Sequence, residues 1–194
     1  MHVRSRAIRL VTLAALSTIL VACGDDSGDP VGIDEVFQGT YTATLTGALT
    51  ETLSGRAWFG SGTDPETGES AWIAYLVTDA QNPLAAGENV MFFGLGEPQQ
   101  TGYVLADISG GGEFPEGGAA GMVLTYAAQT LSGAFSSTGG SLTVTSLSST
   151  RMDGTFNFTA EGAVFTGGVP SEGTITVSGS FEAEGGSFLS PFGP

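Results

Sequence analysis

Hydrophobic and polar residues alternate along much of the chain. The segment 37–45 reads FQGTYTATL, in which Tyr41 and Leu45 share one side with small residues while Thr and Gln occupy the other. A period of two residues is typical of a strand with one buried and one wetted face. Segments 152–160 and 173–184 repeat this alternation with Phe inward and Thr or Ser outward. The pattern therefore predicts antiparallel strands.

Two central segments, 71–78 and 89–96, are apolar at nearly every position. Strands of this kind are buried on both faces, so we expect each of them to be covered on both sides. The remaining expected strands are 53–60, 101–108, 121–127 and 141–147. The spacers between them are rich in Gly, Pro, Asp and Asn, which favour turns.

These elements predict one all-β domain over residues 37–186, followed by a short tail at 187–194. About nine short antiparallel strands with polar turns are typical of a single β-sandwich or a small β-barrel. The pattern leaves both alternatives open. No amphipathic helix of useful length is expected after the first 22 residues.

The N-terminus has a different pattern, because three arginines precede an uninterrupted run of apolar and small residues at 10–20. A basic segment, a short apolar run and small residues before a cleavage point are typical of a secretory signal peptide, here 1–22. The run is shorter than the roughly 20 residues that span a bilayer. The next residue, Cys23, is the chain's single cysteine, and LVAC resembles the lipobox of bacterial lipoproteins. A plain signal peptide with an incidental cysteine is the alternative.

The lipobox resemblance implies that Cys23 carries acyl chains, which would anchor the chain to a membrane. Residues 23–36 are acidic and contain Gly, as expected of a flexible tether. By analogy with enterobacterial sorting, Gly24 after the cysteine favours the outer membrane. We therefore expect a cell-envelope location, on the periplasmic face or the cell surface.

The chain is strongly acidic, with 20 Asp plus Glu against 5 Lys plus Arg and a net charge of −15. After the signal peptide the cations are Arg56 and Arg151 alone. Such a surface repels nucleic-acid phosphates, so nucleic-acid binding is excluded as a function class. It also repels anionic lipids, so the expected membrane attachment depends on the lipid at Cys23.

The chain contains few of the residue types that usually carry out catalysis. The one histidine, His2, lies in the signal peptide, and the chain has no Lys. A Ser-His-Asp triad, a Schiff-base lysine and the usual zinc sites are therefore not expected. Carboxylate pairs of the glycosidase kind remain, and the candidates are Glu113 with Glu116 and Glu182 with Glu184. All four are more simply read as solvated acids, and we expect neither an enzyme nor a cofactor.

One acidic turn offers hard oxygen ligands, because Asp64, Glu66 and Glu69 follow one another between two expected strands. Calcium binds six to eight such oxygens. The spacing does not match an EF-hand, and Pro65 and Gly68 are typical of an ordinary turn. A calcium site and a solvated turn are the two interpretations.

The aromatic residues are the other candidates for function. Trp58, Trp72, Tyr75 and Tyr103 lie in expected strands, and Arg56 is a lone cation near the first of them. They could contact an apolar small molecule or a glycan in a cavity of the domain, with Arg56 binding an acidic group. Ordinary core packing is the alternative for the aromatic rings.

The C-terminal third carries a recurring set of Thr, Phe and Gly positions. These positions are Gly140, Thr143, Val144 and Thr145, then Gly154, Thr155, Phe156 and Phe158, then Thr174, Ile175, Thr176, Val177, Gly179 and Phe181. This set resembles the closing segment of a family of short bacterial lipoproteins of unknown function from Bacteroidetes. The resemblance implies a β-rich exported lipoprotein and supplies no catalytic residue.

Taken together, these features favour an exported, lipid-anchored, non-catalytic binding or interaction module. Its partner would be a small apolar molecule, a glycan or another envelope protein. A structural, self-assembling surface component is one alternative, and a carboxylate-dependent hydrolase is another.

Overall fold

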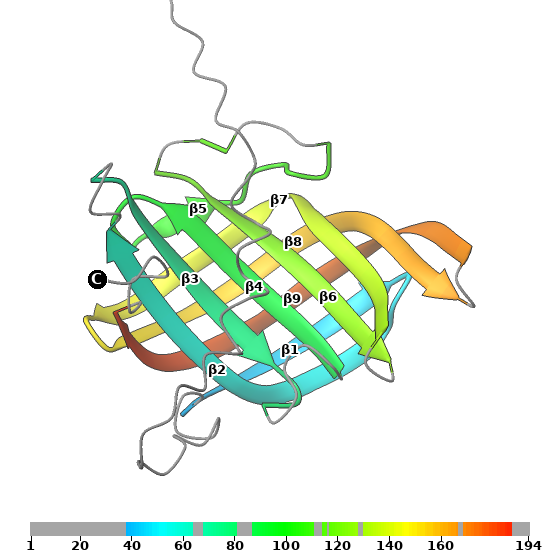
Figure 1. Cartoon of the computed structure of the whole chain (residues 1–194), viewed down its shortest axis with the longest axis horizontal. Helices are drawn as coiled ribbons and strands as arrows, with labels where there is room; N and C mark the ends of the chain where they lie inside the picture. Colours follow the sequence, from blue (N-terminus) through cyan, green and yellow to red (C-terminus); the bar gives the residue numbers. More distant parts are fainter. Residues whose placement is uncertain are drawn as a thin grey trace, which may run out of the picture. The chain divides into compact units, whose positions relative to one another are not determined.

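Nine β-strands form one sheet in the computed structural model, which describes residues 38–63, 68–80, 87–110, 114–115, 117–127, 130–166 and 169–187 (Figure 1). The strands are β1 (Gly39–Gly47), β2 (Glu51–Thr63), β3 (Ser70–Val77), β4 (Gly87–Leu95), β5 (Gly102–Val104), β6 (Ala119–Ala127), β7 (Thr130–Ser148), β8 (Arg151–Thr166) and β9 (Val169–Ser187). The predicted all-β fold with about nine strands is confirmed.

The sheet is ring-like. Its strands follow the order β5-β7-β6-β4-β3-β2-β1-β9-β8, and a further pairing of β7 with β8 closes the circuit. All strands except β5 therefore have a neighbour on each side within the ring. Neighbouring strands are antiparallel, apart from a short parallel pairing of β2 with β9 at Trp58–Ser61 and Glu184–Ser187.

The interior of the ring is a packed aromatic and aliphatic core. Along β1 the burial alternates strictly, as the sequence predicts, with Tyr41 and Leu45 inward and Thr outward. The ring of Phe92 on β4 lies 5.0 Å from that of Phe156 on β8 and 6.2 Å from that of Phe181 on β9, measured between centroids. The core thus joins strands from opposite halves of the sequence, which holds the ring closed.

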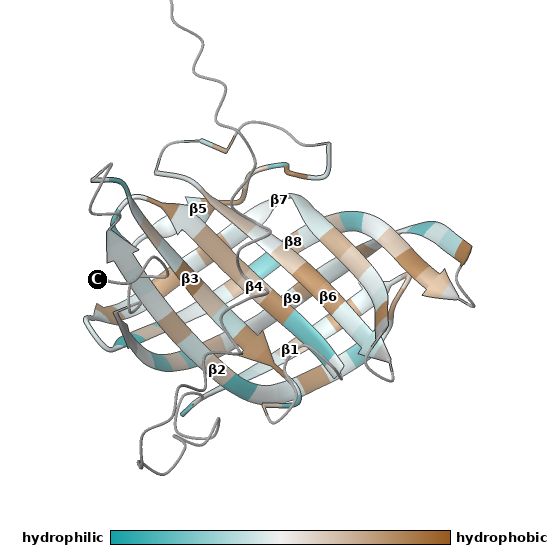
Figure 2. Ribbon diagram, viewed as in Figure 1, coloured by the Kyte–Doolittle hydropathy of each residue, from teal (hydrophilic) through white to brown (hydrophobic). Residues whose placement is uncertain are grey.

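The central strands β3 and β4 are apolar over most of their length (Figure 2). Inward residues of β3 include Trp72 and Leu76, whereas Val77 lies on the other side and is nevertheless fully buried. On the outer side of β4, the Phe93 ring stacks on Phe114, with centroids 5.4 Å apart. Burial on both faces therefore agrees with the prediction at these positions.

Four strands differ clearly from the predicted bounds. β7 begins at Thr130, whereas the prediction begins at 141; β5 covers Gly102–Val104 of the predicted 101–108. The segment between the two last predicted strands is expected to be a spacer. In the structure β8 continues into it as far as Thr166, and β9 already begins at Val169. β5 ends early because its pairing with β7 is interrupted: the Leu105 amide still donates to the Gly140 carbonyl of β7, but the Ala106 amide donates to the Ala119 carbonyl of β6. The Ile108 amide then donates to Ser137 of β7.

The predicted signal peptide, the lipidated Cys23, the tether and residues 188–194 of the tail lie outside the described residues. In the part of the chain that the structure describes, no helix is long and apolar enough to cross a bilayer.

Candidate functional site

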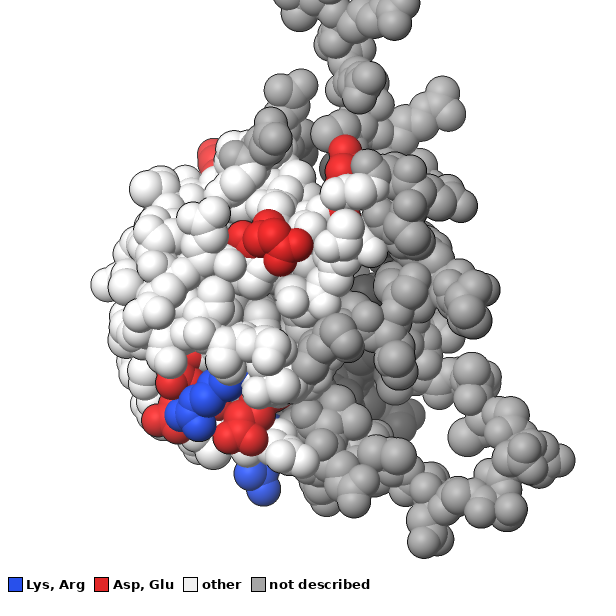
Figure 3. Space-filling model, turned by 90° about the vertical axis from the view of Figure 1, so that its left-hand side faces the viewer, with Lys and Arg blue, Asp and Glu red and all other residues white. Residues whose placement is uncertain are grey.

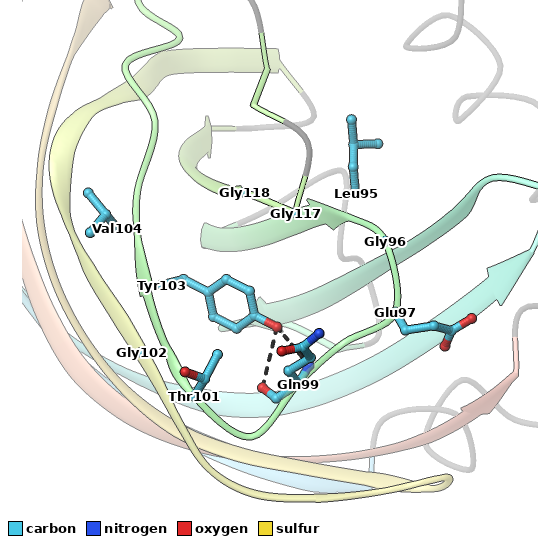
Figure 4. A pocket seen from close by; sticks show the side chains of 10 residues that line it. All are labelled: Leu95, Gly96, Glu97, Gln99, Thr101, Gly102, Tyr103, Val104, Gly117 and Gly118. Carbon is cyan, nitrogen blue, oxygen red and sulfur yellow. Dashed lines mark hydrogen bonds between the residues drawn. The ribbon is translucent and has the colours of Figure 1, made fainter.

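A pocket of about 240 Å³ lies where β4 ends and β5 begins, at a seam in the wall of the ring. Its walls come from three stretches of chain. They are the end of β4 with the following turn, the strand β5, and the two glycines before β6 (Figure 4). We call it the seam pocket, and it is lined by Leu95, Gly96, Glu97, Gln99, Thr101, Gly102, Tyr103, Val104, Gly117 and Gly118.

An aromatic pair supports the seam pocket from the core. The rings of Trp72 and Tyr103 lie 5.3 Å apart at an angle of 51°, and only 2% of Trp72 is exposed. The indole lies directly over Gly94, where a Cβ atom would be 2.4 Å from Trp72 Nε1. Glycine is therefore required at this position of β4. The Nε1 atom has no hydrogen-bond partner among the described residues.

The hydroxyl of Tyr103 is fully used within the pocket wall. It accepts a hydrogen bond of 2.7 Å from the Gln99 amide and donates one of 3.3 Å to the Gln99 carbonyl (Figure 4). These two bonds hold the turn after β4 against β5. The phenol consequently fixes the shape of the pocket, and its one O–H donor is already used.

The same turn is fixed to the neighbouring strands. Ser70 of β3 donates a 2.6 Å hydrogen bond to Glu97 Oε1, and the Gly96 amide donates one of 2.7 Å to the Ser70 carbonyl. On the other side, Gln100 Nε2 donates a 2.7 Å bond to the Thr145 carbonyl of β7. A turn anchored to two strands gives the pocket a preformed wall with one carboxylate at its rim.

The structure brings together two of the five predicted ligand-contacting residues, Trp72 and Tyr103. Trp58 and Tyr75 are cross-strand neighbours elsewhere, on the outer side of β2 and β3, where they pack against Val77. Arg56 lies exposed on β2 and forms no ion pair with a carboxylate that the structure describes.

The carboxylates of Glu182 and Glu184 surround the other described cation, Arg151. Arg151 binds Asp153 at 2.7 Å, Glu182 at 2.8 Å and Glu184 at 3.4 Å. The hydrogen bond and charge of Asp153 chiefly raise the pKa of the Arg151 guanidinium. Basic and acidic side chains gather at one edge of the face shown in Figure 3. The predicted pair is therefore committed to a salt bridge network between β8 and β9.

The other acidic candidates remain predictions. Asp64, Glu66, Glu113 and Glu116 lie outside the described residues, and Glu69 is exposed. Within the described ranges, no group of three or more His, Cys, Asp or Glu side chains is placed to hold a metal ion.

Sequence reasoning missed most of the pocket wall. Gln99, Gly102 and Val104 were not singled out, because a polar glycine-containing turn resembles any other hairpin connection. One available signal was the set of glycines at 94, 96 and 102 on both sides of that turn. Glycines in strand positions commonly mark a close approach of another group.

A second, more open hollow of about 660 Å³ lies at the base of the β8–β9 hairpin. Glu161 and Glu172 line it together with Ser109 and Gly110 from the segment after β5. Its lining contains no aromatic residue, whereas Tyr103 lines the seam pocket.

Comparison with protein-family models, with curated proteins and with solved structures finds no match to this chain. The resemblance of the C-terminal third to a lipoprotein family accordingly stays a prediction.

Proposed function

We propose that this chain is a lipid-anchored, non-catalytic binding module of the bacterial cell envelope, and that the seam pocket is its binding site. The observation that carries the proposal is the preformed pocket wall. Tyr103 and Glu97 form hydrogen bonds that hold the turn in place, so the site is organised before any ligand binds. Anchoring through Cys23 and location at the outer membrane rest on the lipobox and on Gly24.

The lack of catalytic chemistry in the sequence supports binding over turnover. The mature chain has no histidine, lysine or free cysteine with which to build a nucleophile and base. The carboxylates Glu182 and Glu184 each form an ion pair with Arg151. The residues available in the chain therefore favour a binding role over hydrolysis.

A pocket-filling variant tests the proposal. A Cβ atom at Gly102, a lining residue of the seam pocket, meets no heavy atom within 4 Å, so Gly102→Leu adds a bulky side chain at the pocket's edge. Gly110 is equally open and lines the second hollow, which makes Gly110→Leu the matched control. The full chain would be isolated in mild detergent from the cells that produce it and examined by native mass spectrometry.

We expect a bound mass that leaves on denaturation, is absent from Gly102→Leu and persists in Gly110→Leu. Loss from Gly110→Leu alone would assign binding to the second hollow. Equal retention by both variants, or an empty wild-type protein, would contradict the proposal.

A further inference from the structure

Alternate positions of the turn after β4 bring polar side chains to the seam pocket. Glu97, Gln99 and Thr101 line the pocket, and Tyr103 of β5 follows them in the same rhythm. Gln100 belongs to the other side of the turn, because its side-chain amide donates to a carbonyl of β7. The turn therefore presents three polar residues and one aromatic ring to a single hollow (Figure 4).

These three polar residues keep hydrogen-bonding groups that the pocket wall does not use. Within the described part of the chain, the hydrogen bonds of Gln99 and Thr101 are made by their backbones. The two hydroxyls that bond to Glu97 from β2 and β3 both donate to Oε1. The Gln99 amide, the Thr101 hydroxyl and Glu97 Oε2 are therefore available to a ligand.

The aromatic part of the pocket is a firmly held ring. Tyr103 is 8% exposed, and Trp72 packs against it from the core with ring centroids 5.3 Å apart. The bonds of its hydroxyl to the turn also fix the orientation of the ring. The aliphatic lining residues Leu95 and Val104 are 37% and 81% exposed, so they border the hollow without enclosing it. The pocket thus combines one fixed aromatic surface with a polar rim.

The charge and size of the seam pocket limit the ligands that it can hold. Its one charged lining residue is Glu97, and the chain has a net charge of −15, which together disfavour an anion. A purely apolar ligand would take water from the polar rim without replacing its hydrogen bonds, which is unfavourable. The volume of about 240 Å³ is smaller than the about 300–1,000 Å³ of pockets for drug-sized molecules. These limits favour a small, neutral ligand rich in hydroxyl groups.

We propose that the seam pocket binds one ring of a neutral sugar. A pyranose has apolar C–H faces and a polar edge, so one face can lie on Tyr103 while its hydroxyls bond to the three polar side chains. Each hydroxyl both donates and accepts, which matches a carboxylate placed beside an amide and a hydroxyl. This inference rests on the proposed function and names its class of ligand. A free monosaccharide and the end of a longer glycan supply the same ring, and the experiment distinguishes these two sources.

The probes are the methyl glycosides of glucose, galactose and mannose, which are neutral pyranoses. Three molecules of similar ring size serve as comparisons: the methyl glycoside of glucuronic acid is an anion, cyclohexylamine is a cation, and cyclohexanol is largely apolar. Saturation-transfer NMR would measure the Kd of each probe by titration against the full chain. The chain would be held in a detergent without a sugar headgroup, with protein-free micelles as the blank.

We expect at least one neutral glycoside to bind with a Kd of about 1 mM or lower. Its deoxy analogues, which each lack one of the bonded hydroxyls, should bind about tenfold more weakly. The glucuronide should bind more weakly than the neutral glycosides, because Glu97 repels its carboxylate. These comparisons use the wild-type protein and so do not depend on the folding of any variant.

The variant Thr101→Val assigns the binding to the seam pocket. It removes one hydroxyl while the shape of the side chain and the bond from β7 to the Thr101 carbonyl remain. Thr42→Val, on the exposed side of β1, is the matched control. We expect Thr101→Val to bind the glycoside about tenfold more weakly and Thr42→Val to bind it as the wild type does. Gly102→Leu should abolish binding.

Undiminished binding by Thr101→Val or Gly102→Leu, or no binding of any neutral glycoside at about 10 mM, would overturn the inference. Tighter binding of cyclohexanol or cyclohexylamine than of every glycoside would overturn it in favour of an apolar or a cationic ligand. Binding of a disaccharide that ends in the preferred sugar would assign the pocket to glycan ends, and its rejection would assign it to the free monosaccharide. The proposed function fails separately: if Gly102→Leu removes a bound mass that is not a sugar, the binding module stands and the sugar is rejected.

Discussion

Burial disfavours the charged forms of two polar side chains in this protein, Tyr41 and Glu88. The Tyr41 hydroxyl is buried without a hydrogen-bond partner in the described residues, and burial is the main cause that raises its pKa, followed by Glu88 and Glu51. Burial also raises the pKa of Glu88, and the charge of Glu51 adds to that effect. In both groups the folded environment disfavours the charged form.

Glu88 should make stability depend on pH. Because its pKa in the folded state lies above the ordinary value of 4.5, the folded protein holds the proton more tightly than the unfolded chain does. Stability is therefore lost as pH rises from that value through the folded pKa. We expect Glu88→Gln to melt at a higher temperature than the wild type at neutral pH and at the same temperature below about pH 4.

Thermal unfolding followed by circular dichroism at both pH values checks this prediction. Glu51→Gln is the control, since it removes only the repulsion and should raise the melting temperature less. A Glu88→Gln variant that is less stable than the wild type at neutral pH would show that the ionised carboxylate stabilises the fold.

At the scale of elements, β7 is the strand on which the ring depends, because it pairs with β8 along its length and with β6 and β5 on its other side. Two irregularities, at Ser137/Gly139 and Val144/Ser146, bend it between those neighbours. Such bulges increase local twist and let one strand serve several partners.

The N-terminal half of β7 was also the largest strand segment that the sequence did not predict. Strict alternation identified β1, β8 and β9, whose own side chains form the core. In TLSGAFSSTGG, however, Phe135 is the one fully buried aromatic residue, and small residues leave space that partner strands fill. The seam pocket could not be predicted for the same reason. The sequence identifies Trp72 and Tyr103 as candidate ligand-contacting residues, but the contact between their rings depends on the small Gly94 and on pairing between strands far apart in the sequence.

Gly140 gives a direct test of this close packing. It has a φ of +126°, and a Cβ atom there would lie 2.4 Å from the Cα of Phe158. We expect Gly140→Ala to lower the free energy of unfolding by about 2 kcal/mol or more, from backbone strain and steric overlap together. Gly102→Ala, at an open position, should change it by less than about 1 kcal/mol.

Urea unfolding of the two variants measures the difference. Equal stabilities would mean that β7 and β8 separate easily at Gly140 and that the ring is held mainly at its other pairings.

At the scale of the whole molecule, ring closure removes nearly every free strand edge. Each described strand other than β5 has neighbours on both sides, and closed sheets of this kind resist unwanted pairing. Among the described strands, β5 alone lacks a strand neighbour on one side, where Leu105 just after it bridges Ala119 of β6, and this side lies beside the seam pocket. This coincidence links the fold to the proposed binding role.

The charge of the molecule determines how it can be held at a membrane. With a net charge of −15, and with three of its five cations in the predicted signal peptide, the mature domain is repelled by anionic lipids. Attachment should therefore depend on the acyl chains predicted at Cys23 and not on the domain surface.

We expect the wild-type protein to stay with membranes in high salt, because salt screens charge interactions and leaves acyl insertion intact. A variant whose residues 1–23 are replaced by a cleavable signal without a lipobox should be fully released into the soluble envelope fraction at any salt concentration. Fractionation and immunoblotting measure both forms, and a variant that stays with the membrane would mean that the domain itself binds the bilayer or a membrane protein.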